Sequence, residues 1–366
     1  MQGSDDASTL GIRGDRPDVF YKLRQVALSQ RQRREHLICA SSQPKILNPR
    51  GRGERPQRRR RVFACGQQAG MLPTMSATQV RRPIITIAGP GSLGNALAIS
   101  LHAAGYRISE ILSRPGKASR LRARALARKV GARAALIGKE PCNADVLWLC
   151  VPDREIRNCA EFLARSGGWS KRAVLHSSGA LTSDELAALR SRGASVASVH
   201  PLMTFVPGEI PSLAGVPFAI EGDWTATRVA RRIARHLGGE PFQISKADKT
   251  AYHAWGAFAS PLLTALLVTA EQVAAAARIP RRRARKMMLP ILRQTLANYA
   301  SFGGPNGFSG PIVRGDIDTV KRHLRALEST PVARKVYAAL AQGAIEYLPT
   351  KNKTGLRHVI ERALRR

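Results

Sequence analysis

The chain has 366 residues, of which 44% are hydrophobic, so it is long and apolar enough for two globular domains. Its 59 Lys and Arg against 25 Asp and Glu give a formal charge of +34, but this charge is spread along the chain without a helix-turn-helix or aromatic RNA-binding pattern. The composition therefore favours a solvated basic surface over a nucleic-acid site. The five cysteines lack C-x-x-C spacing, which argues against a metal cluster or a disulfide framework and favours a cytoplasmic location: Cys39, Cys65, Cys142, Cys150 and Cys159.

Residues 1–82 are rich in arginine, glycine and proline and show neither a helical nor a strand period. We expect a disordered basic extension here. If nucleic acid is bound at all, this extension is the segment that would bind it.

From Ile84 the chain alternates short apolar runs with helical patterns. The runs begin at Ile84, Arg107, Asp145, Ala173, Ala194, Pro217 and Pro241, with a weaker one near Ala134. Such alternation predicts an α/β fold with a mostly parallel sheet and helices on both faces, here a doubly wound Rossmann domain over residues 83–245. An all-α domain follows over 246–348, and then a basic tail over 349–366.

The segment from Thr250 to Ala270 contains no charged residue and is long enough to cross a bilayer. It is rich in alanine and carries His253, Ser260 and Pro261, so we interpret it as a helix buried on all sides of the all-α domain rather than as a membrane span. Pro261 should bend or break this helix.

The first strand runs directly into a G-x-G-x-x-G turn that opens a helix. Gly89, Gly91 and Gly94 are its glycines, with Ser92 and Leu93 between the last two. The first glycine permits the tight turn, the second lets the backbone approach a pyrophosphate, and the third lets helix and strand pack closely. The context predicts a dinucleotide site.

The end of the second strand selects the nucleotide. An NAD site normally offers an acidic residue there, whereas this chain has Ser113 and Arg114, with Lys117 or Arg120 in support. A hydroxyl and a guanidinium suit a 2′-phosphate, so NADP is favoured over NAD. Glu110 is the competing ribose ligand, but it lies inside the strand.

Polar residues also follow three later strands. Val151 and Pro152 end a central strand on the expected nicotinamide side, and Asp153 is interpreted as the cap of the next helix. The next two strand ends carry further candidate substrate residues: His176, Ser177, Ser178, His200 and Thr204. For each histidine alone a structural role is favoured, although His200 followed by Pro201 suits a substrate-facing turn.

Six segments in fixed order carry a resemblance to a known family: GPGSLGNALA, CVPDREI, HSSGAL, VHPLMTF, KADKTAYHA and SGPIVRGD. The chain from Ile84 to Leu348 resembles Rossmann-like oxidoreductases with an uncharacterised helical domain, similar in plan to 6-phosphogluconate dehydrogenase and pyrroline-5-carboxylate reductase. The resemblance implies NAD(P)-linked redox chemistry and an all-α domain that often forms homodimers. It does not supply a substrate.

Lys249, His253, Gly256 and Ser260 share one face of a helix at the start of the all-α domain. Lys249 and His253 resemble the substrate-side Lys and Asn of hydroxyacid dehydrogenases, although His replaces the Asn. With His200 and Ser178 they form the predicted catalytic set, and a Lys or His can supply a proton as hydride reaches a carbonyl or imine carbon. We therefore predict an NAD(P)-dependent oxidoreductase of a small metabolite. A cofactor-binding sensor without turnover and a nucleic-acid-associated protein remain alternatives.

Overall fold

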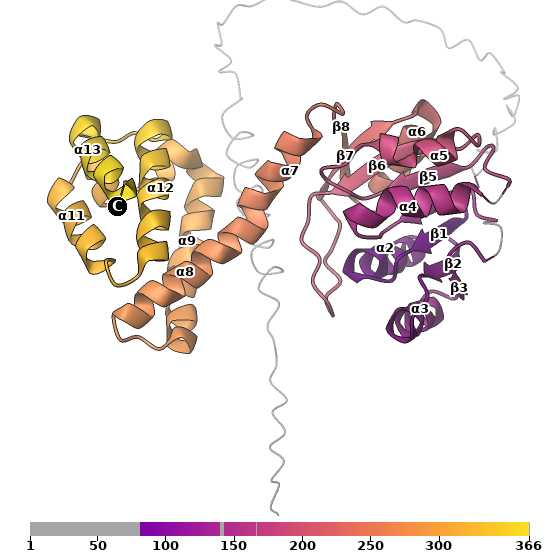
Figure 1. The fold of residues 1–366 in the computed structure, drawn as a ribbon, viewed down its shortest axis with the longest axis horizontal. Coiled ribbons are helices and arrows are strands. Elements are labelled where there is room, and N and C mark those ends of the chain that lie inside the picture. Colours follow the sequence, from indigo (N-terminus) through magenta and orange to yellow (C-terminus); the bar gives the residue numbers. More distant parts are fainter. Residues whose placement is uncertain (1–80, 140–142, 166, 366) are drawn as a thin grey trace, which may run out of the picture. The chain divides into compact units, whose positions relative to one another are not determined.

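The computed structural model describes residues 81–139, 143–165 and 167–365 (Figure 1). The predicted basic extension lies outside the described residues, apart from Arg81 and Arg82. Cys39, Cys65 and Cys142 lie outside them too.

The described residues form an eight-stranded sheet in the order β3-β2-β1-β4-β5-β6-β7-β8. The strands are β1 (Ile85–Ala88), β2 (Ile108–Ser113), β3 (Arg133–Leu136), β4 (Val146–Leu149), β5 (Ala173–His176), β6 (Ser195–Pro201), β7 (Pro217–Gly222) and β8 (Glu240–Gln243). Each predicted apolar run forms one of them. Every neighbouring pair is parallel except β6 and β7, so the predicted mostly parallel sheet is confirmed. The order of the strands reverses between β1 and β4, and doubly wound sheets bind their ligands at such a switch point.

Helices cover both faces of the sheet, because its central strands are apolar on both sides. They are α2 (Ser92–Ala103), α3 (Lys117–Lys129), α4 (Asp153–Ala164), the 3₁₀ turn η1 (Ser183–Leu186), α5 (Ala187–Arg190) and α6 (Trp224–His236). α2, α3 and α6 bury their apolar residues against one face, and α4, η1 and α5 against the other.

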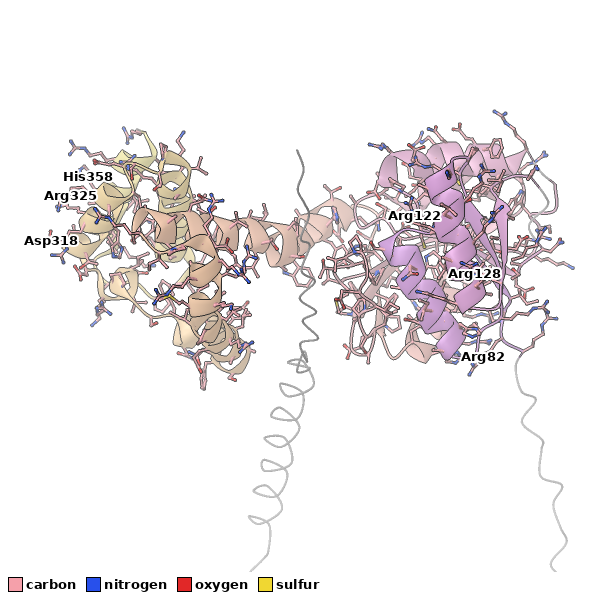
Figure 2. All side chains as sticks on the ribbon, turned by 90° about the horizontal axis from the view of Figure 1, so that it is seen from below. Arg82, Arg122, Arg128, Asp318, Arg325 and His358 are labelled. Carbon is pink, nitrogen blue, oxygen red and sulfur yellow. The ribbon has the colours of Figure 1, made fainter. Side chains whose placement is uncertain are left out.

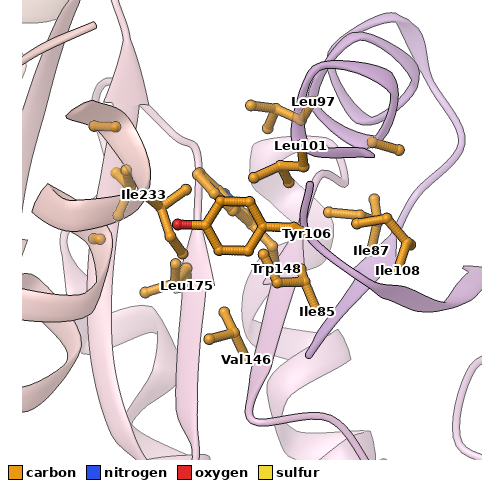
Figure 3. Close-up of a cluster of buried hydrophobic side chains, with 14 of the residues drawn as sticks. Ile85, Ile87, Leu97, Leu101, Tyr106, Ile108, Val146, Trp148, Leu175 and Ile233 are labelled. Atoms are coloured by element: carbon orange, nitrogen blue, oxygen red, sulfur yellow. The ribbon is translucent and has the colours of Figure 1, made fainter. Parts of the chain in front are cut away.

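The first face has Tyr106 and Trp148 at its centre (Figure 3). The Tyr106 ring lies among Leu101 of α2, Ile85 of β1 and Ile233 of α6. Its hydroxyl is 2.7 Å from His236 Nδ1, which satisfies the one polar atom of a side chain that is only 2% exposed. This core fixes α2, and with it the glycine turn at its start.

After the sheet the described chain is helical. The elements are α7 (Lys249–Ala257), the π-helical turn η2 (Phe258–Leu262), α8 (Leu263–Ala276), α9 (Arg281–Gly307), α10 (Pro311–Arg314), α11 (Ile317–Ala326), α12 (Pro331–Tyr347) and α13 (Lys353–Leu364). α11, α12 and α13 share an apolar core. The helices thus run past Leu348, and the expected basic tail contains α13, which buries Leu356 and Ile360.

Two expectations for the uncharged helix are corrected. Pro261 neither ends nor breaks it, because the π turn η2 absorbs the missing backbone hydrogen bond and α7, η2 and α8 run on as one helix. This helix, Lys249–Ala276, is long and apolar enough to cross a membrane by length and composition, yet only 6% of its most apolar window is buried. It is therefore not buried on all sides. Lys249 and Tyr252 at its start pack against the Rossmann domain, a position unsuited to a membrane span.

Candidate functional site

The glycine turn has the backbone geometry that the motif predicts. Gly89 has a φ of +109°, and a Cβ there would collide with the Cys150 carbonyl, while one on Gly94 would collide with the Gly89 carbonyl. At Gly91 a Cβ would meet nothing within 4 Å. Gly91 therefore faces open space, and no side chain caps the first turn of α2. Free backbone N–H groups beside open space suit a pyrophosphate.

A pocket of about 380 Å³ opens beside this turn, at the carboxyl ends of β1, β2 and β4. Gly89 and Gly91 line it together with Val151 and Pro152, the predicted nicotinamide-side residues. Cys150 lies beneath the turn, and burial raises the pKa of its thiol well above the usual range. The pocket and the switch point of the sheet therefore coincide.

Two arginines line the far part of this pocket. Arg114 follows β2 as predicted, and Arg122 joins it from α3 together with Ser119 (Figure 2). Both arginines are exposed. Arg122 was missed in the sequence because helix α3 brings it back one and a half turns after its start, a geometry that the spacing of the glycine motif does not specify.

The other proposed 2′-phosphate ligands lie elsewhere. Ser113 is buried and lines a different pocket with Arg120, on the far side of the β2 terminus. Glu110, the competing ribose ligand, forms an ion pair with Arg133 of β3. The alternation of side chains along a strand explains both, because Ser113 points away from the glycine turn while Arg114 is already past the strand.

The carboxyl end of β4 is tied to that of β5 by a hydrogen bond. Ser178 Oγ donates to Asp153 Oδ2 at 2.7 Å and accepts from Leu181 N at 2.9 Å. Asp153 starts α4 but makes no capping bond, so its expected role as a helix cap is wrong. It fixes the loop after β5 instead, and that loop adjoins Pro152 of the pocket.

His176 and Ser177 belong to the core beneath this loop. The Ser178 N–H donates to His176 Nδ1 at 3.1 Å, so Nε2 carries the ring proton and donates to the Thr182 carbonyl at 3.0 Å. Burial lowers the pKa of His176 to about 4. Ser177 Oγ accepts from Trp148 Nε1 at 2.8 Å. Both residues are structural.

Lys249 is fully buried behind the loop. Its Nζ donates to the Ser178 carbonyl at 3.0 Å and to Ser198 Oγ at 2.8 Å. Burial lowers the pKa of Lys249 to about 8, opposed by the negative charges of Glu221 and Asp153. The side chain has no exposed surface, so it positions the loop rather than presenting an ammonium to a ligand.

His200 and His253 meet on the open side of the same loop. Their ring centroids are 6.0 Å apart and nearly perpendicular. A Cβ on Gly179 would lie 2.5 Å from His253 Cδ2 and 2.9 Å from His200 Nε2, so the loop touches both rings. His253 is exposed, whereas Thr204 lies in the exposed loop beyond β6 and takes no part in this cluster.

Tyr252 supports His200 from α7. Its hydroxyl is 2.9 Å from His200 Nδ1, and the two rings pack edge to face. Burial lowers the pKa of His200 to about 4, reinforced by the charge of Lys249, and raises the pKa of Tyr252 to about 12. Tyr252 was missed in the sequence because the four-residue spacing drew attention to Lys249 and His253, although Tyr252 lies on the adjoining face.

The structure thus gathers Ser178, His200, Lys249 and His253, the four residues of the predicted catalytic set, around the loop after β5. The same loop is bonded to Asp153, beside Val151 and Pro152 of the glycine-turn pocket. One continuous edge of the sheet therefore carries both parts of the predicted site.

Family models match both regions of the chain. A Rossmann-like domain matches residues 71–201, and a domain of unknown function, DUF2520, matches residues 216–344. The Rossmann-like match spans strands β1–β6, and the DUF2520 match spans β7, β8 and most of the helices that follow. No curated protein matches the sequence. The resemblance and fold class that the motifs predicted are confirmed.

Several solved structures are similar to this chain over most of its length. Protein TM1727 from Thermotoga maritima is 25% identical with a TM-score of 0.57, covering 77% of this chain and 100% of that one. BF3122 from Bacteroides fragilis, named a "putative NADP oxidoreductase", is 20% identical with a TM-score of 0.61 and covers 71% of this chain and 97% of its own. An imine reductase from Pseudomonas sp. is 19% identical with a TM-score of 0.50, and the match covers 72% of this chain and 94% of that one. These likenesses establish the fold.

Proposed function

We propose that the protein is an NADPH-dependent oxidoreductase that reduces a carbonyl or imine carbon of a small metabolite, or oxidises the corresponding product. One observation carries this proposal. A glycine-turn pocket at the switch point of the sheet leads, through the Asp153–Ser178 hydrogen bond, to a loop that touches two histidines. The names of BF3122 and of the imine reductase agree with this chemistry.

The pocket residues fit the cofactor by their chemistry. The uncapped first turn of α2 and the open space at Gly91 would take the pyrophosphate, and Arg114 and Arg122 would take the 2′-phosphate. Val151 and Pro152 would lie toward the nicotinamide. The bound cofactor supplies a hydride, and the protein residues orient the substrate and manage the proton.

His200 and His253 are the residues placed to meet the substrate. With Tyr252 Oη donating to Nδ1 of a neutral His200, the Nε2 of His200 carries its proton toward the Gly179 side. His253 is exposed on the same side. We assign proton donation to His253 and hydrogen-bond donation to the neutral His200, with Lys249 and Ser178 as positioning residues that hold the loop.

Cofactor titrations test the proposal. The purified protein should bind NADPH more tightly than NADH, measured by fluorescence. Arg122→Gln and Arg114→Gln should each weaken the binding of NADPH by about tenfold or more, which is the effect of losing one charge-assisted hydrogen bond. The binding of NADH should change little. Arg124→Gln is the matched control, because Arg124 lies on the same helix but lines the Ser113 pocket. Equal affinity for the two cofactors in the wild type refutes the NADP assignment.

Turnover separates an enzyme from a sensor. Steady oxidation of NADPH in the presence of small carbonyl or imine compounds should occur and should fall in His200→Gln and His253→Gln by about a hundredfold. NADPH affinity should stay within a few-fold. Tight NADPH binding without turnover on a broad panel of such compounds would support the sensor instead.

We also propose a homodimer formed through the helical region, in the cytoplasm. η2 and α9 expose large apolar side chains, including Phe258 (71%), Ile291 (67%) and Phe302 (60%). An exposed apolar surface of this kind is typical of an interface, and a second copy of the chain offers the same surface in return. Sedimentation should give twice the monomer mass, and Ile291→Glu should shift it toward the monomer. The free thiols of Cys150 and Cys159 suit a reducing compartment.

A further inference from the structure

A second pocket, of about 740 Å³, lies among α11, α12 and α13 and contains no residue of the site described above. Its apolar wall includes Leu324 and Val359, which continue the core of these three helices. The charged residues of its lining are Lys321, Arg325, Glu328, Arg334 and Arg362, with His358 beside them (Figure 2). Four cationic side chains therefore share one hollow with one carboxylate.

Two arginines of this pocket lack the acidic partners that two other arginines of the α13 region have. Arg357 and Arg365 of the α13 region lie outside the pocket, and each has a carboxylate within 4.0 Å, from Glu346 and Glu361. Arg325 and Arg362 line the pocket, and within the described residues neither has an acidic partner within that distance. Lys321 of the pocket contacts Asp318 at 4.0 Å, so the charge available to a ligand lies mainly on the arginines.

Arg334 lines the pocket from α12 and is anchored to α13. One guanidinium N–H donates to the Ala363 carbonyl at 3.1 Å, which holds the side chain between α12 and α13. Its Nε is buried, with no hydrogen-bond partner within the described residues. Through its bond to Ala363, Arg334 is held in the pocket lining as a fixed positive charge.

We propose that this pocket binds a small metabolite carrying two phosphate groups. A phosphate monoester brings a charge of about −1.5 to −2 at neutral pH, so two such groups balance four cations and one carboxylate, whereas a single carboxylate ligand does not. Guanidinium groups from two helices can each hold one phosphate bidentately. The apolar wall then contacts the body of the ligand.

Calorimetric titration of the full chain with inorganic pyrophosphate tests the proposal. The double variant R325Q/R362Q should weaken pyrophosphate binding by about tenfold or more, because each arginine supplies charge-assisted hydrogen bonds. Both side chains are exposed, so the variant should fold. The double variant R322Q/R357Q removes the same charge from the same two helices outside the pocket and should bind pyrophosphate like the wild type.

Two further arms separate other sources of binding. R114Q/R122Q should keep the pyrophosphate binding that depends on Arg325 and Arg362, which distinguishes this pocket from the glycine turn. Equal binding by R325Q/R362Q and the wild type, or equal losses in both double variants, would overturn the proposal. The proposal would also be overturned if R325Q/R362Q bound a short DNA duplex more weakly than the wild type but bound pyrophosphate equally well. That result would indicate a surface for a nucleic-acid backbone.

Discussion

Replacing Lys249 by methionine should change how the stability of the protein depends on pH. The lysine is fully buried, and its Nζ bonds two oxygens of the loop and of β6. Its pKa is about 8 in the folded protein, against 10.5 for an unperturbed lysine. The unfolded chain therefore binds more protons than the folded one between these two values, and the free energy of unfolding rises with pH across that window.

The size of this effect follows from the two pKa values. Between about pH 7.5 and about pH 10, the Lys249 contribution to the free energy of unfolding should increase by about 2 kcal/mol. Below about pH 7.5 both states are protonated, and the folded state carries the full cost of the buried charge. Lys249→Met removes this pH-dependent term, because methionine has a similar length and no charge.

Urea denaturation of wild type and variant at both pH values measures the difference, and comparing the two proteins cancels other groups that titrate in the range. From about pH 7.5 to about pH 10, the free energy of unfolding of the wild type should rise by about 2 kcal/mol more than that of Lys249→Met. Lys246→Met, which removes a half-exposed lysine one turn earlier, should show no comparable gain. If the difference in the free energy of unfolding between wild type and Lys249→Met stays constant with pH, the lowered pKa of the buried Lys249 is refuted.

Two further predictions concern the loop and the extension. Gly179→Ala should lower NADPH-dependent turnover by about tenfold or more while leaving NADPH affinity unchanged. The new Cβ would displace the His200 and His253 rings but touches no residue of the glycine turn. Single-turnover kinetics and a cofactor titration would measure the two effects, and loss of cofactor binding would contradict the argument. Deleting residues 1–74 should leave NADPH affinity and thermal stability unchanged, because the glycine turn and all described strands follow Ile84; a truncated protein that unfolds would contradict it.

The Rossmann domain could be predicted from the sequence because its signals are local. Each apolar run became a strand, and the glycine turn follows β1 at the switch point, since hydrophobic period and glycine placement are set by nearby residues. The gathering of Ser178, His200 and Lys249 was also predictable, because the carboxyl ends of parallel strands share one edge.

Side-chain direction was harder to predict than position. Ser113 faces the wrong pocket because the last strand residue points away from the glycine turn, and Arg122 was missed because it returns to the pocket from α3. The uncharged helix was expected to be buried, but apolar composition does not say which chain covers a surface. The α11–α13 pocket depends on packing among three helices, which no single motif encodes.

The buried charge of Lys249 explains why the two histidines nearest to it stay neutral. It lowers the pKa of both His176 and His200, in addition to their burial, so that each titrates near pH 4. The loop from Ser178 to Gly179 thus has a buried cation on one side and a neutral imidazole on the other. A neutral imidazole can donate a hydrogen bond at neutral pH without bringing a second charge into the site, while the cation behind the Ser178 carbonyl favours negative charge developing nearby. For a site in which hydride arrival makes an oxygen or nitrogen basic, this separation places the positive charge behind the Ser178 carbonyl, hydrogen-bond donation on the neutral His200 and proton delivery on His253.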